Sequence, residues 1–540
     1  MNVACQSPRR QRRLISAVAA AVLVAVALVY GLTLTTVPGV HCDEPWLAER
    51  SLSLLETGQF SCPSFPLSYA QVGSISPAAD VLQVNIFRLL GYNLTSVRLL
   101  SLAAFLGSLF FWYRVILALS DEWAAVAFLY LYPAQVLVFY AAHIGRFEMP
   151  IIFVFSVAVY LAVAWRPGIS AQVRFFLVAA TGSLAVFFHL PGALVPVVAV
   201  LVGAWAQRLP RAQLLPAALS ATAGALAMAI LYLSLIDLDA LRWALTGDYR
   251  NAVGPQAAST GGFGAYLSNW LQLTLRGSWV AGPIYEGTLL TAICLPWFIV
   301  GLSMRRTRFG VATLLIGAAL TLLLLAVIGH PNEHYLVYIS PWAAGALAIG
   351  LTAVGTGCPN QRTLSTKLWW GAALATLLLF GLRLVVFITV AYRGNFQDYR
   401  ASLQAGIPAG AVVFATIENQ ILVVGANRLV ALDDLRMLHR MGRSPAVGDY
   451  FANTGVGYVI LDAEAYRTLR RPASQPWGEE VITYIHQHGR LVARVPNDYL
   501  RLTPGLASLA PVGGVLASLH PTYRRQSEAP TEVWQLPQRP

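Results

Sequence analysis

The feature that most limits what this chain can fold into is a succession of long apolar runs over its first 390 residues. About eleven of these runs approach the roughly 20 residues that a helix needs to cross a bilayer. They fall near 14–34, 96–118, 123–142, 149–165, 174–190, 192–206, 214–236, 284–303, 309–328, 335–356 and 368–391. Because 57% of the residues are hydrophobic and only 11% are charged, we expect an all-α polytopic membrane protein.

The arginines indicate how the chain is oriented in the membrane. A basic flank precedes the first run, which is too long for a signal-peptide core and has no cleavage site after it, so we interpret it as a retained anchor. Further arginines recur in alternate short connections, as at Arg208 and Arg305. By the positive-inside rule these connections and the N-terminus are cytoplasmic, and the protein is placed in the plasma (inner) membrane. The net charge of +12 therefore reflects topology, and no nucleic-acid partner is expected.

Two long outer loops and a C-terminal domain follow from this orientation. The loops cover about 35–95 and 236–283, within a membrane domain assigned to residues 1–391. Residues 392–540 are expected to form an extracytoplasmic α/β domain. In it "AVVFAT", "VGYVILD" and "RLVARV" resemble strands, and "VITYIHQHG" resembles the end of a helix. The segment after about Pro521 is expected to fray.

An acidic pair opens the stretch "DEPWLAERSLSLLETGQF" just after the first apolar run. One explanation is local: Asp43 is a good N-cap, Glu44 suits a first helical turn, and Gly58 ends the helix. Capping explains one acid and the proline. It does not explain why a second amphipathic segment, 77–93, follows on the same outer face.

These residues resemble the membrane glycosyltransferases of the GT-C fold. The pattern is similar to glycosyltransferase family 39, the branch of protein O-mannosyltransferases and lipid A aminoarabinose transferases, in which an Asp-Glu pair opens a juxtamembrane helix. The resemblance rests on Asp43, Glu44, Ala48, Glu49, Gly58, Gln59 and Phe60, with "RLLGYNLTSVRLLSL" further on. It implies that Asp43 is the catalytic base, with Glu44 beside it, and that the donor is a polyprenyl-phosphate sugar. Trp46 replaces an arginine of the aminoarabinose enzymes, and their Glu-Lys-Pro has no equivalent in this loop.

Other polar residues at the outer face are candidates for the same site. In "HIGRFE" a local ion pair is one alternative; by the resemblance, Glu148 is a second carboxylate that orients the acceptor or a metal, and Arg146 or His143 contacts phosphate. In "GHPNEHY", interfacial anchoring and a loose metal-ligand pattern are the alternatives to donor-phosphate binding. The complete set of donor-phosphate candidates is Arg146, Arg276, His330, His334 and Tyr335.

Cysteine placement adds one structural expectation. Cys42 and Cys62 both fall in the first outer loop, where a disulfide between them is permitted, and two free thiols are the alternative. The identity of a metal is unknown, and a divalent cation, Mg²⁺ or Mn²⁺, is left open as a cofactor.

The function expected from these features is inverting sugar transfer at the extracytoplasmic face, with Asp43 as general base. The partners are a polyprenyl-phosphate-linked sugar, an acceptor that is lipid, glycan or protein, and the bilayer. No Walker loop or Rossmann fingerprint is present, which argues against nucleotide-powered transport and against a nucleotide-sugar donor site of the Rossmann kind. The alternatives are a secondary transporter and a non-catalytic, membrane-anchored cell-envelope assembly protein.

Overall fold

The computed structural model describes residues 8–68, 74–165, 168–245, 263–275, 287–328, 333–353, 364–391, 396–424, 427–471, 474, 477–496 and 530–537.

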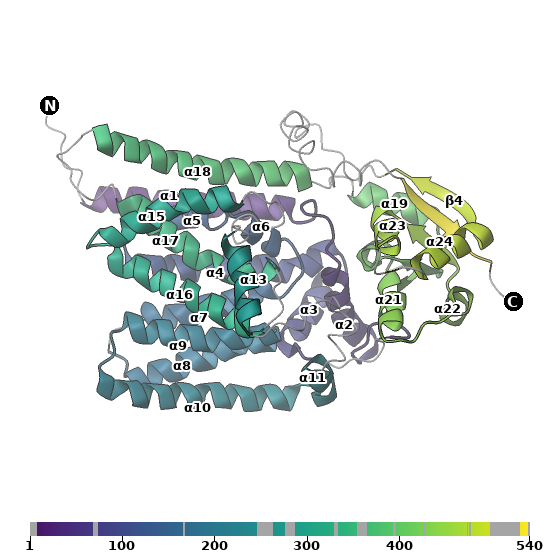
Figure 1. The fold of residues 1–540 in the computed structure, drawn as a ribbon, viewed down its shortest axis with the longest axis horizontal. Coiled ribbons are helices and arrows are strands. Elements are labelled where there is room, and N and C mark those ends of the chain that lie inside the picture. The colour runs from purple at the N-terminus through teal and green to yellow at the C-terminus, as the bar shows by residue number, and fades with distance from the viewer. Residues whose placement is uncertain are drawn as a thin grey trace.

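Apolar helices form one bundle, and the longest of them run along the longest axis of the molecule (Figure 1). They are α1 (Pro8–Thr33), α4 (Leu94–Leu119), α5 (Glu122–Leu131), α6 (Val136–Ala142), α7 (Glu148–Val163), α8 (Ala171–Ser183), α9 (Leu194–Ala206), α10 (Arg211–Leu235), α15 (Gly287–Ser303), α16 (Arg308–Ile328), α17 (Ser340–Ala353) and α18 (Leu364–Ala391). Short 3-10 segments, η1 (Leu184–Phe187), η2 (Leu190–Ala193) and η3 (Glu333–Tyr338), interrupt the connections. Helix is therefore found in every one of the apolar runs identified from the sequence.

Fewer helices are long enough to span a membrane than there are apolar runs in the sequence. Among the described residues, α1, α4, α10, α16 and α18 are long and apolar enough to cross a membrane. The pair α5 and α6 adds a sixth span only if it is counted as one helix bent by 69°. Helices α7, α8, α9 and α15 are apolar but shorter. The count of about eleven spans thus remains a prediction.

The bundle core is built on large aromatic side chains. Trp112 of α4 and Trp342 of α17 are fully buried and meet edge to face with ring centroids 4.7 Å apart, and Phe155 of α7 packs on Trp342 at 5.5 Å. A Cβ atom on Gly317 of α16 would lie 2.4 Å from the Trp342 ring, so only glycine allows α16 to approach this closely. These contacts hold α4, α7, α16 and α17 together.

Three short helices lie at one end of the bundle: α2 (Asp43–Thr57), α3 (Pro77–Leu90) and α11 (Leu238–Leu245). Helix α13 (Phe263–Leu275) packs against α16, with Trp270 buried in the bundle core. As predicted, Gly58 ends α2, in a left-handed conformation with φ of 75°. In Figure 1, α2 and α3 lie between the bundle and the sheet at the right of the view.

The C-terminal elements form a mixed five-stranded sheet with helices packed on it. They are α19 (Phe396–Ala405), β1 (Val412–Ala415), η5 (Ile417–Asn419), α20 (Gln420–Val423), β2 (Arg428–Ala431), α21 (Leu432–Arg440), α22 (Val447–Thr454), β3 (Tyr458–Leu461), α23 (Ala463–Leu469), α24 (Trp477–His488), β4 (Arg490–Val495) and β5 (Thr531–Gln535). The strand order is β2-β1-β3-β5-β4; β2, β1 and β3 are parallel, and β5 runs antiparallel to both neighbours.

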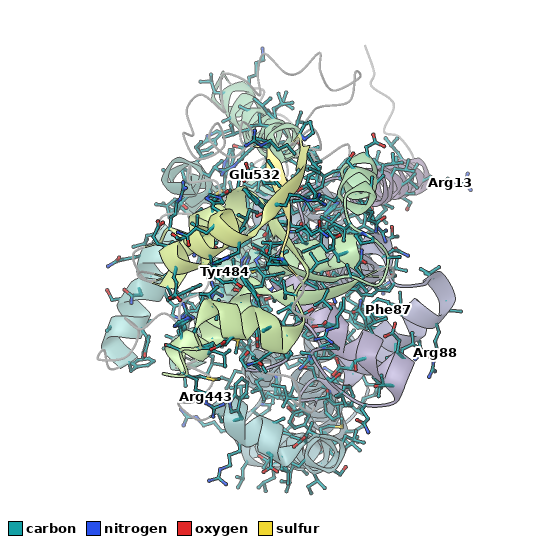
Figure 2. All side chains as sticks on the ribbon, turned by 90° about the vertical axis from the view of Figure 1, so that its right-hand side faces the viewer. Arg13, Phe87, Arg88, Arg443, Tyr484 and Glu532 are labelled. Carbon is teal, nitrogen blue, oxygen red and sulfur yellow. The ribbon has the colours of Figure 1, made fainter. Side chains whose placement is uncertain are left out.

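The strands and the helix expected from the sequence are all present, but one expectation was wrong. Residues 531–535 do not fray; they form β5, which lies between β3 and β4. The physical reason is that β5 alternates buried and half-buried side chains, with Thr531 and Val533 completely enclosed. Figure 2 looks onto this part of the molecule, with Glu532 of β5 and Tyr484 of α24 labelled.

The sheet is tied by hydrogen bonds to the segment between α1 and α4. The backbone N–H of Ala431, at the end of β2, donates to the carbonyl of Ser64 over 2.8 Å. The backbone N–H and hydroxyl of Ser68 both donate to Oδ1 of Asp434, at 2.8 and 2.5 Å. Tyr92 donates to the side-chain oxygen of Gln420 in α20. The loop that follows α2 is therefore clamped between the bundle and the sheet.

Candidate active site

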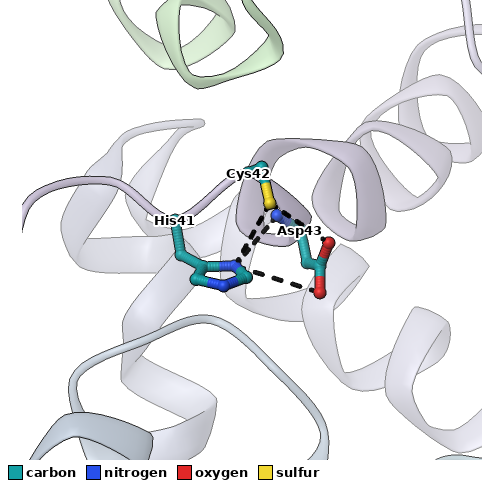
Figure 3. A group of neighbouring side chains, drawn as sticks. All are labelled: His41, Cys42 and Asp43. Carbon is teal, nitrogen blue, oxygen red and sulfur yellow. Dashed lines mark hydrogen bonds and ion pairs between the residues drawn. The ribbon is translucent and has the colours of Figure 1, made fainter. Parts of the chain in front are cut away.

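The first turn of α2 is organised by His41 rather than by Asp43. Cys42 occupies the N-cap position but makes no side-chain capping bond. Instead, Nδ1 of the His41 ring accepts the backbone N–H of Asp43 over 3.1 Å (Figure 3). The capping role considered for Asp43 is consequently filled by a neighbour, which leaves its carboxylate available for other contacts.

Asp43 points at an arginine held by a second carboxylate. Oδ2 of Asp43 accepts a hydrogen bond from Nη1 of Arg146, in the loop that precedes α7. Nε of Arg146 donates to both oxygens of Glu148 at 3.0 and 3.2 Å, and Nη2 of Arg146 lies 2.7 Å from Oε1. The side chains of Arg146 and Glu148 are 9% and 6% exposed, whereas that of Asp43 is 29% exposed. Of the three, Asp43 is the group most open to an incoming molecule.

The pKa of Asp43 reflects this arrangement. Burial alone would raise the pKa, but the positive charge of Arg146, with smaller contributions from His41 and His334, outweighs it and lowers the pKa to about 2. Asp43 is therefore ionised throughout the physiological pH range.

Glu44 is enclosed and has a different environment from its neighbour. Its side chain and that of Arg98 in α4 are both fully buried and form a two-pronged ion pair at 2.8 and 2.9 Å. The same carboxylate accepts the backbone N–H groups of His41 and Gly145, each at 2.7 Å. Four donors surround it, so the geometry makes Glu44 a positioning residue that joins α2, α4 and the loop before α7.

Aromatic and imidazole rings cover the other side of Asp43. The His334 ring stacks on Tyr140 with centroids 5.5 Å apart and meets His41 edge to face at 5.2 Å. Tyr335 lies beside His189, with centroids 6.2 Å apart. Burial lowers the pKa of His41 and lowers that of His334 to about 3, so both rings are neutral at pH 7. The rings offer hydrogen bonds and stacking surface rather than positive charge.

None of the remaining predicted site residues contacts Asp43 in the part of the chain that the structure describes. Arg276 and His330 lie outside the described residues. His143, weighed as a phosphate contact, is fully buried: its ring nitrogens meet Thr33, Tyr30 and Phe139, so it joins α6 to α1 and does not face Asp43.

The disulfide expected between Cys42 and Cys62 is not formed, and both thiols are free. The reason is that the two side chains face different neighbours. Sγ of Cys42 faces Nδ1 of His41 and Oδ1 of Asp43, while Cys62 is buried and hydrogen-bonded to the side chain of Trp46.

A group of three potential metal ligands is present, but it does not fit Mg²⁺ or Mn²⁺. Ligand atoms of His41, Cys42 and Asp43 lie within 4.8 Å of one another. Hard cations such as Mg²⁺ require oxygen ligands, and only Asp43 supplies one here. Glu148, the expected metal-orienting acid, has both oxygens engaged by Arg146. No step of the reaction is therefore assigned to a hard divalent cation at these residues.

Several residues of this site were not singled out from the sequence. Arg98 had a readable signal, since an arginine inside a long apolar helix is costly unless it is paired. His41 also had one, because it lies two positions before Asp43. Tyr140 had none, since a single aromatic ring at a helix end is common at membrane interfaces.

No family model matches the chain, and a search of curated proteins found no relative. Among solved structures, ArnT from Cupriavidus metallidurans in the apo state is similar with a TM-score of 0.55 and 14% identity, over 88% of this chain and 96% of that chain. ArnT bound to undecaprenyl phosphate gives a TM-score of 0.54 with the same identity and coverage. The apo oligosaccharyltransferase of Archaeoglobus fulgidus has a TM-score of 0.49 at 12% identity, over 88% of this chain and 73% of that chain.

The likeness to ArnT extends over nearly the whole of both chains. At 14% identity this likeness supports a shared fold and does not establish a shared reaction. The fold that the resemblance in the first loop implied is confirmed: the chain has the GT-C architecture of ArnT.

Proposed function

We propose that this protein is an integral-membrane glycosyltransferase that moves a sugar from a polyprenyl-phosphate donor to an acceptor hydroxyl at the extracytoplasmic face. The observation that carries the proposal is the position of Asp43: an ionised, partly open carboxylate begins the juxtamembrane helix of a GT-C fold and faces a buried arginine. The donor class is supported by the undecaprenyl phosphate bound to ArnT. Residues 1–391 would form the catalytic membrane domain and 392–540 an extracytoplasmic α/β domain.

In the proposed reaction Asp43 acts as general base. It takes the proton of the acceptor hydroxyl while the acceptor oxygen bonds to the anomeric carbon. The bond from that carbon to the phosphate oxygen breaks, and the electron pair leaves with the polyprenyl phosphate. Displacement in a single step inverts the anomeric configuration.

Arg146 connects donor binding to base strength in this scheme. An aspartate whose pKa is about 2 is a weak base. A donor phosphate at Arg146 competes with Asp43 for the guanidinium, and losing that contact raises the pKa of Asp43. The same arginine then balances the negative charge that builds up on the leaving phosphate. His334 and Tyr335 would hydrogen-bond the phosphate or the sugar, and Arg276 and His330 remain proposed phosphate ligands.

The direct test supplies purified full-length protein with a set of radiolabelled polyprenyl-phosphate sugars. We expect one label to leave the lipid and appear in product or, without acceptor, in free sugar of inverted configuration. If the protein binds these lipids but releases label from none of them, the proposed glycosyltransferase activity is refuted. Net movement of labelled sugar across proteoliposomes without bond cleavage would instead support the transporter.

The orientation of the first loop can be tested separately in intact cells. Gln59 is exposed just after α2 and, introduced as Gln59→Cys, should react with a membrane-impermeant maleimide. The matched control is Arg305→Cys, exposed in a connection expected to be cytoplasmic. Both are made with Cys42→Ser to remove an exposed native thiol. Labelling of Arg305→Cys but not Gln59→Cys would place the site on the wrong face and refute the proposal.

A pH profile tests the link between Arg146 and Asp43. In the native protein without bound donor the acid limb that Asp43 contributes to kcat/KM lies near pH 2, so kcat/KM should be insensitive to this group between pH 5 and 8, a window chosen to lie about three or more pH units above that pKa. In Arg146→Gln the remaining burial raises the pKa, and the residual activity, which needs the carboxylate ionised, should fall as the pH is lowered through the new value. An acid limb that does not move on this substitution would separate Arg146 from the base.

A further inference from the structure

Three consecutive residues place three different ligand atoms around one point at the start of α2. Nδ1 of His41 lies 3.8 Å from Sγ of Cys42, and that Sγ lies 3.5 Å from Oδ1 of Asp43. Nδ1 also lies 3.9 Å from Oδ2, the other oxygen of Asp43, and one ligand atom from each of the three residues lies within 4.8 Å of the other two (Figure 3). In a tetrahedral zinc site, bonds of about 2.0–2.3 Å place neighbouring ligand atoms roughly 3.3–3.6 Å apart. The three side chains therefore have to rotate so that ligand atoms up to 4.8 Å apart approach by about 1 Å to reach metal-binding geometry.

The chemistry of the three ligand atoms indicates which class of metal would bind. An imidazole nitrogen, a thiol sulfur and one carboxylate oxygen match Zn²⁺ and similar soft divalent ions, and they match Mg²⁺ poorly. Cys42 occupies a position where Ser, Thr, Asp or Asn usually caps a helix, yet its thiol makes no capping bond. Its sulfur faces the other two ligands instead.

The local charges allow a cation at this point. Arg98 is neutralised by Glu44, and Arg146 is shared between Glu148 and Asp43, so three carboxylates face two arginines. The two oxygens of Asp43 are also divided between partners, with Oδ2 toward Arg146 and Oδ1 toward Cys42. A metal on Oδ1 therefore leaves the contact with Arg146 in place.

We propose that His41, Cys42 and Asp43 form a binding site for Zn²⁺ or a similar soft divalent ion, and that occupancy of this site blocks the enzyme. Binding forms one nitrogen–metal, one sulfur–metal and one oxygen–metal bond, with water in the fourth position beside His334. The thiol proton is released to solvent, and His41 gives up the backbone N–H of Asp43. The blocking effect rests on the proposed function, because it follows from the metal occupying the carboxylate that would take the acceptor proton.

The binding test uses Co²⁺ as a spectroscopic probe for Zn²⁺ on the purified full-length protein. We expect a thiolate-to-cobalt charge-transfer band that Zn²⁺ displaces and that is absent in Cys42→Ser. The matched control is Cys62→Ser, which removes a buried thiol on the same loop and should keep the band. His41→Ala should weaken Co²⁺ affinity by at least about tenfold, the lower end of the cost of losing even an indirect metal contact. A band that survives in Cys42→Ser, or no band in the native protein, overturns the proposal.

The inhibition test uses transfer from the polyprenyl-phosphate sugar that proves active. We expect Zn²⁺ to inhibit the native protein and Cys62→Ser alike, and the concentration for half inhibition to rise at least about tenfold in Cys42→Ser. Mg²⁺ at the same concentrations should not inhibit. Equal inhibition of the native protein and Cys42→Ser overturns the blocking role. If no sugar is transferred under any condition the proposed function fails, while the Co²⁺ spectrum still decides whether the metal site exists.

Discussion

Asp43→Asn is expected to lower the rate of sugar transfer by about 10²–10⁴-fold, the range that a positioned general base contributes. Asparagine keeps the size of the side chain and can still accept a hydrogen bond from Arg146, but it cannot take up the acceptor proton. Because the carboxylate is partly exposed and caps no helix, the abundance and thermal unfolding of the protein should change little.

The matched control lies on the same helix. Glu56 is an exposed acid in the last turn of α2, and Glu56→Gln should leave transfer unchanged. Transfer is measured with the donor identified in the radiolabel experiment, at saturating donor and acceptor. Full activity in Asp43→Asn would show that Asp43 is not the base and would leave it as part of a structural ion pair with Arg146.

Glu44→Gln is expected to produce the second large effect, on stability rather than on chemistry. Removing one partner of a fully buried, hydrogen-bonded ion pair typically costs about 3–5 kcal/mol, because the other charge is left uncompensated. In this protein the uncompensated charge is Arg98, which also donates to the carbonyls of Leu34, Pro38 and Gly39. The expected result is a low yield of folded protein and a lower midpoint of thermal unfolding in detergent.

A double-mutant cycle tests whether the pair is the cause. Arg98→Met alone leaves Glu44 buried and uncompensated, and the double variant removes both charges. The double variant should lose clearly less stability than the sum of the two single losses. Normal stability in Glu44→Gln combined with lost transfer would show that Glu44 takes part in the reaction after all.

The local features of this fold could be predicted from the sequence because they depend on residues that are close together in the chain. The apolar runs place the helices, and the spacing of Leu52 and Leu55 with the stop at Gly58 places α2. The short apolar segments place β1, β3 and β4. Each of these depends on a period or a cap that lies within a few positions of the chain.

Contacts between residues that are far apart in the sequence could not be predicted in the same way. Glu44 and Arg98 are 54 positions apart, and their pairing depends on how α2 docks against α4. The loop with His143 looked functional as a whole, yet packing buried His143 and left Arg146 facing Asp43. The cysteines shared a loop, and that proximity along the chain did not bring the two thiols together, because their side chains face different neighbours.

The place of β5 in the sheet has a consequence for how the protein assembles. Leu461 of β3 pairs with Glu532 of β5, across a separation of 532 − 461 = 71 residues, while β4 comes earlier in the chain and touches the sheet only through β5. Closing so long a loop is entropically costly and slow. The parallel trio β2, β1 and β3 can therefore form early, and β4 has to wait for a later segment before it can join. Without β5, one edge of β3 and the whole of β4 have no pairing partner among the described strands, and unpaired edges of this kind are templates for mispairing.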